Sequence, residues 1–81
     1  MEVDRDSGVP PYQQVAAWLR ERILSGELTG RLPSAVSLSQ ETGIAVYTGR
    51  KALLVLVDEG LARITPGMGT YVVPEDERPS R

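Results

Sequence analysis

The sequence predicts a mainly α-helical domain with one small antiparallel β-sheet, an α+β chain of three helices followed by a β-hairpin. A length of 81 residues suits one small domain. Residues 10–59 contain three candidate helices, and each is followed by a glycine. Residues 61–73 then contain two β-branched and aromatic segments on either side of a glycine-containing turn.

The first helix is expected from about Pro11 to Ser25, and Gly26 is expected to end it in a left-handed conformation. Proline is tolerated at this start because the first N–H groups of a helix have no intrahelical partner. One face of the helix collects the apolar residues Tyr12, Val15, Ala16, Leu19 and Ile23. Trp18 flanks that face, so partial burial and contact with a partner are both open to it.

The second helix is expected over Ala35–Thr42, with Ser34 in the N-cap position. A serine hydroxyl there accepts a hydrogen bond from a backbone N–H of the first turn. A nucleophilic role for Ser34 has no support, because the chain contains no histidine and no G-x-S-x-G motif that would activate it. The helix is poor in good helix formers, so packing through Leu38 must hold it.

The third helix is expected from about Ala45 to Glu59, after a turn at Gly43 and Ile44. Its core-facing residues are Gly49, Ala52, Leu53 and Leu56. A glycine inside a helix costs about 1 kcal/mol relative to alanine, so Gly49 indicates a close approach of another helix. Two short helices joined by a glycine-containing turn are typical of a helix-turn-helix.

A β-hairpin is expected after Gly60. Leu61–Thr65 and Thr70–Val73 have the composition of strands, and the four residues between them contain two glycines. Three helices followed by such a hairpin form a winged helix-turn-helix.

The composition excludes most enzyme chemistry. The chain has no cysteine and no histidine, which removes disulfides, the common zinc sites and imidazole catalysis. Asp58 and Glu59 are adjacent in a helix and point about 100° apart, so they do not converge on one substrate. No apolar run approaches the ~18 residues of a membrane span, and the N-terminus does not resemble a secretory signal. We therefore expect a cytoplasmic protein that is not an enzyme, with no metal, no cofactor and no membrane partner.

The net charge of −2 is unevenly distributed. Residues 10–73 carry six bases and five acids, whereas both ends are acidic. The ends are also polar and lack an apolar period, so we expect flexible tails at 1–9 and 74–81 around a domain at 10–73.

Residues 10–73 resemble the N-terminal DNA-binding domain of the GntR family of bacterial transcription regulators. The resemblance is carried by an ordered set of short motifs: Pro11-Tyr12-x-Gln14-Val15, Ile23-x-x-Gly26-x-Leu28, Leu32-Pro33-Ser34, Leu38, Gly43, Ala52-Leu53-x-x-Leu56, Gly60-Leu61 and Gly67-x-Gly69-Thr70-Tyr71-Val72. It implies a dimeric, sequence-specific regulator of transcription that binds double-stranded DNA. The helix near 45–59 would enter the major groove, and the wing at 66–70 would lie at the minor groove. Members of the family normally continue into a ligand-binding or dimerising domain, so we expect either one domain of a longer protein or a stand-alone domain.

The residues expected to contact DNA lie at the second helix start, on the third helix and at the wing. They are Ser34, Tyr47, Thr48, Arg50, Lys51, Gly67, Gly69 and Thr70. Arg31 and Arg63 are candidate accessory cations. Glycines at the wing tip would let the backbone enter a groove only about 6 Å wide.

Three positions depart from the pattern of the family. Val36, Val46 and Met68 stand where its members typically carry a cationic residue. Fewer cations predict fewer phosphate contacts and a shallower dependence of affinity on salt. Tyr47, or Val46 against a thymine methyl group, is a candidate replacement.

Leu54 and Val57 stand where the family often has charged residues. With Val46 and Arg50 they form a stripe beside the core face of the third helix, and exposed apolar patches often mark interaction surfaces. Trp18, Leu54 and Val57 are therefore candidate interface residues for a homodimer or a protein partner. The alternative function is a protein-interaction module, an antirepressor or accessory factor, on a winged-helix scaffold with weakened DNA binding. Burial of the stripe within the domain is equally open.

Overall fold

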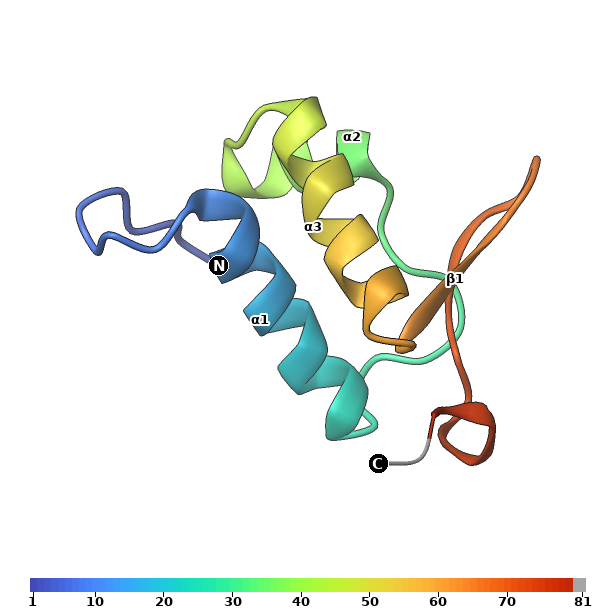
Figure 1. Ribbon diagram of the computed structural model, residues 1–81. Coiled ribbons are helices and arrows are strands. Elements are labelled where there is room, and N and C mark those ends of the chain that lie inside the picture. The colour runs from blue at the N-terminus through green and yellow to red at the C-terminus, as the bar shows by residue number, and fades with distance from the viewer. Residues whose placement is uncertain (80–81) are drawn as a thin grey trace.

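The computed structural model describes residues 1–79, and it confirms the predicted fold class. Its elements are α1 (Pro11–Leu24), α2 (Ala35–Thr42), α3 (Val46–Asp58), β1 (Ala62–Thr65), β2 (Gly69–Val72) and the 3₁₀ helix η1 (Glu75–Glu77). The strands form one antiparallel sheet, and α1 and α3 lie side by side with the hairpin on the side of α3 away from α1 (Figure 1). None of the helices within residues 1–79 is long and apolar enough to cross a membrane.

The core forms between the three helices and the base of the hairpin. The predicted inner face of α1 is buried at Val15, Ala16, Leu19 and Ile23, whereas Tyr12 is only half-buried. α1 and α3 run in the same direction, because Tyr12 contacts Lys51 near their starts and Arg20 contacts Glu59 near their ends.

The turn between α2 and α3 follows from local sequence. Ser34 caps α2 as predicted, its Oγ accepting from the Ser37 N–H at 3.0 Å. Gly43 ends the helix with a φ of 79°, and Ile44 is buried against the core. A Cβ placed on Gly49 would lie 3.0 Å from the Ala35 carbonyl oxygen, which confirms the close approach of α2 and α3.

The wing gains a third extended segment from residues 30–32. Arg31 forms a β-bridge with Tyr71. The Leu32 N–H donates to the Thr70 carbonyl at 2.8 Å, and the Val72 N–H donates to the Gly30 carbonyl at 2.7 Å. This pairing fixes the base of the wing beside the start of α2.

Both terminal segments contact the domain. The Asp4 N–H donates to Gln14 Oε1 at 2.8 Å, and Gln14 Nε2 donates to the Asp4 and Val9 carbonyls. After β2, Arg78 Nε donates to the Val73 carbonyl at 3.0 Å. The flexibility expected of these segments stays a prediction, and residues 80–81 of the second lie outside the described residues.

Candidate nucleic-acid interface

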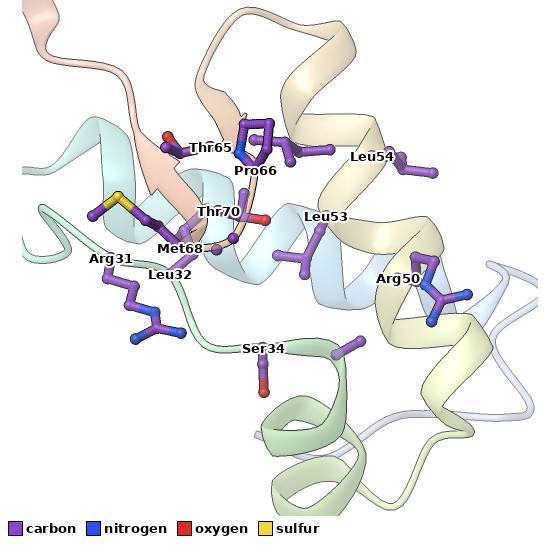
Figure 2. Close-up of a pocket in the computed structure, with 14 residues that line it drawn as sticks. Arg31, Leu32, Ser34, Arg50, Leu53, Leu54, Thr65, Pro66, Met68 and Thr70 are labelled. Carbon is purple, nitrogen blue, oxygen red and sulfur yellow. The ribbon is translucent and has the colours of Figure 1, made fainter.

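An open groove of about 560 Å³ lies between the start of α2, one side of α3 and the wing. Leu32 and Leu53 contribute apolar surface to it, and Met68 lies at the wing on the same side as Arg31 (Figure 2). Arg31 enters from the segment before α2, and Arg50 lies on α3 across the groove from it. Among residues 1–79, no acidic residue lines the groove, although the whole chain carries a net charge of −2.

Arg31 and Arg50 are exposed and make no ion pair or side-chain hydrogen bond among residues 1–79. Lys51 makes neither as well, but it packs on Tyr12 and does not line the groove. Three arginines that lie elsewhere are paired with carboxylates: Arg20, Arg22 and Arg63. Arg5, which precedes α1 and does not line the groove, is the remaining arginine of the described residues without such a contact. The groove therefore holds two guanidinium groups whose donors are free for an anionic ligand.

The N-terminus of α2 adds to the positive potential of this groove. Ser34 and Ala35 line it, and the first N–H groups of a helix lack intrahelical partners. The aligned peptide dipoles place a partial positive charge there, which favours an anion such as a phosphate group. The hydroxyl of Ser34 is already engaged, because it accepts from the Ser37 N–H and donates to Ser37 Oγ at 3.1 Å. The backbone at this point is thus freer to bind an anion than the serine side chain.

The first turn of α3 projects into solvent next to the groove. Tyr47 is 69% exposed and Val46 is 38% exposed, and Ala45 at the N-cap is exposed as well. The turn is not enclosed by the protein, and residues 62–72 are paired as a hairpin. The first turn of α3 is therefore accessible to a ligand, and the wing beside it is formed.

The structure brings together most, but not all, of the residues expected to contact DNA. Five of them line the groove: Ser34, Arg50, Gly67, Gly69 and Thr70. Tyr47 is exposed on the adjoining turn, and Thr48 is half-buried. Lys51 lies on the side of α3 that faces α1, with its Nζ 4.2 Å from the centre of the Tyr12 ring. Arg31, expected only as an accessory cation, lines the groove, whereas Lys51 does not. The pairing of its segment with β2 places Arg31 there.

The expected protein-interface residues do not form one surface. Leu54 is 47% exposed and lines the groove, whereas Val57 is half-buried against the core. Trp18 lies in a separate depression with Glu41, and the guanidinium carbon of Arg22 is 5.0 Å from its ring centre. Of these three residues, only Leu54 is an exposed apolar side chain.

The chain is similar to regulators of transcription. The family model described as "Bacterial regulatory proteins, gntR family" matches residues 11–72. The transcriptional repressor NagR of Bacillus subtilis is 38% identical over 74 residues, which are 89% of this chain and 30% of NagR. The chain spans about a third of the length of the curated relatives it matches.

Solved structures give the same assignment. YtrA from Sulfolobus acidocaldarius, a GntR-family transcription factor, is 35% identical with a TM-score of 0.80, over 93% of this chain and 65% of YtrA. The DNA-binding domain of AraR, solved in complex with the operator ORX1, is 29% identical with a TM-score of 0.81, over 90% of this chain and 95% of that domain. The chain thus belongs to the GntR family of bacterial regulatory proteins, and its fold is the winged helix-turn-helix of that family's DNA-binding domains.

Proposed function

We propose that this chain binds double-stranded DNA sequence-specifically as the DNA-binding domain of a transcription regulator. The helix over 45–59 enters the major groove, and the wing at 66–70 lies at the minor groove. The observation that carries the proposal is the groove beside α3, which has no acidic residue and contains the unpaired arginines Arg31 and Arg50.

The groove suits the phosphate backbone. A guanidinium group binds phosphate oxygens through charge-assisted, often paired hydrogen bonds. Arg31 and Arg50 approach the groove from two different elements, and the N-terminus of α2 offers backbone N–H groups near Ser34. Phosphate contacts of this kind fix the register of a protein on DNA, while the first turn of α3 meets the base edges.

The biological role follows from the relatives. NagR and the MngR protein of Escherichia coli are both named repressors, and AraR is solved with its operator. We infer that this chain acts in transcription control in the bacterial cytoplasm, where it meets DNA, and that a homodimer is its working form. The family consists of transcription regulators and is not an enzyme class.

The alternative of a protein-interaction module is not favoured, because similar domains have been solved bound to operator DNA. The exposed Leu54 is the observation that would support it. Leu54→Glu distinguishes the two functions. A protein-interaction module would lose association with a partner or with itself in this variant, whereas a DNA-binding domain would lose DNA affinity, because Leu54 lines the groove beside Arg50 and a carboxylate there repels phosphate.

The test of the proposal is a titration of labelled duplexes, selected from a random library, at several salt concentrations. Each phosphate neutralised adds about 0.9 to the slope of log affinity against log salt, so Arg31→Ala and Arg50→Ala should each lower the slope by about one. Arg22→Ala is the control, because Arg22 is paired with Glu27 and lies outside the groove. Unchanged affinity and slope in both groove variants, or no selected duplex at all, would contradict the proposal.

A further inference from the structure

The side of α3 that leads toward DNA carries no charged side chain where it begins. No charged residue occurs over 43–49, and Val46 and Tyr47 are the large exposed side chains of the first turn. The first cation, Arg50, lies one turn further along the helix. A recognition turn without charged side chains must distinguish bases by a contact other than an ion-assisted hydrogen bond.

The major groove offers one apolar group for such a contact. Guanine, cytosine and adenine present hydrogen-bond donors and acceptors there, whereas thymine adds a C5 methyl group to its single acceptor. An aliphatic or aromatic side chain pressed against a polar base edge leaves that edge without a partner, which is costly. The same side chain against a methyl group removes apolar surface from water on both partners.

We propose that Val46 and Tyr47 recognise thymine methyl groups, so that the DNA site carries thymine at the positions that face the first turn of α3. This inference rests on the proposed function and deepens it. Val46 and Arg50 are four residues apart, hence on neighbouring positions of one helix face and about 6 Å apart along its axis. The selected thymines should therefore lie within about two base-pair steps of the nucleotide that Arg50 contacts.

Deoxyuridine substitution tests the contact directly. Replacing one thymidine of the selected duplex by deoxyuridine removes the methyl group and keeps the base pair. The wild-type chain should bind about fourfold more weakly for each contacted methyl group removed. Val46→Ser and Tyr47→Ser should bind the thymidine duplex more weakly and lose the discrimination at one thymine each. Replacing such a T·A pair by 5-methylcytosine·guanine should retain more affinity than replacing it by cytosine·guanine.

The matched control is Leu54→Ser, which also removes an exposed apolar side chain from α3 but lies two turns beyond the first turn. This variant should keep the full discrimination between thymidine and deoxyuridine, and all variants should show the wild-type circular dichroism spectrum. Equal affinity for thymidine and deoxyuridine at every position of a tightly bound duplex would overturn the inference and leave DNA binding in place. If selection from the random library yields no duplex that the chain binds, the proposed function is overturned, and this inference with it.

Discussion

Gly69 occupies a position at which a side chain would crowd Arg31 in the groove. Its φ is 125°, outside the region that residues with a Cβ readily adopt, and a Cβ would lie 3.0 Å from Arg31 Nε. Gly67, two residues earlier, has a φ of 76° and open space around it. The two glycines of the wing tip thus have different roles, because only Gly69 makes room for a groove arginine.

Gly69→Ala should therefore lower both stability and DNA affinity. The strained backbone should reduce the free energy of unfolding by about 1 to 3 kcal/mol, and displacement of Arg31 should weaken DNA binding several-fold. Urea unfolding and duplex titration measure the two effects. Gly67→Ala is the control, and it should lower stability while leaving Arg31 in place. Equal losses of affinity in both variants would show that Arg31 does not depend on Gly69.

The placement of single cations shows where prediction from sequence stops. Arg50 was expected at the DNA interface and lines the groove, because its direction follows from its position on one helix. Lys51 was expected there too, yet it packs on Tyr12, 39 residues earlier in the chain. That contact depends on how α1 packs against α3, which no local pattern encodes. The role of Lys51 at the DNA interface stays a prediction.

Among the elements, α1 and α3 are joined toward their C-terminal ends by an ion pair with two hydrogen bonds. Arg20 Nε and Nη2 donate to the two carboxylate oxygens of Glu59 at 2.7 and 2.6 Å. This hydrogen bonding raises the pKa of the Arg20 guanidinium. Because folding raises this pKa, the ion pair contributes its full stabilisation below the pKa of the unfolded arginine. The stabilisation is lost only as pH rises through the raised pKa of the folded state, so Arg20 remains charged at neutral pH.

Glu59→Gln should lower the free energy of unfolding by about 0.5 to 1 kcal/mol, because both partners are partly exposed and water screens the pair. Glu27→Gln is the matched control, since Glu27 is more exposed and accepts a single hydrogen bond from Arg22 Nε at 2.8 Å. Its effect should be close to zero. Urea unfolding of the two variants gives the comparison, and equal effects would show that the paired geometry adds nothing.

Elements with local signals were predicted closely. The bounds of α2 agree with the prediction, because Ser34 and Gly43 mark its two ends by their own chemistry. The helix α3 begins one residue later than expected, with Ala45 as an N-cap that makes no side-chain hydrogen bond. The pairing of residues 30–32 with β2 could not be predicted, since it joins segments about 40 residues apart and has no sequence signature of its own.

Across the whole molecule, the fold separates arginines that are paired with glutamates from arginines that line the groove. The net charge of −2 argues against a binder of polyanions when it is taken as a single number. Folding places Arg31 and Arg50, which make no ion pair among residues 1–79, around one groove, whereas Glu27, Glu59 and Glu77 neutralise other arginines. We therefore expect a phosphate backbone to bind at this groove, although the whole chain has a negative net charge.

On the proposed function, DNA meets the face formed by the start of α2, the first turn of α3 and the wing tip. The most direct test is amide chemical-shift mapping of the isotope-labelled chain, alone and saturated with a selected duplex. We predict the largest shifts at 34–36, 45–50 and 67–70, with little change at the Trp18 indole. Shifts concentrated around Trp18 and Glu41, with the first turn of α3 unaffected, would show that DNA binds another face of the domain.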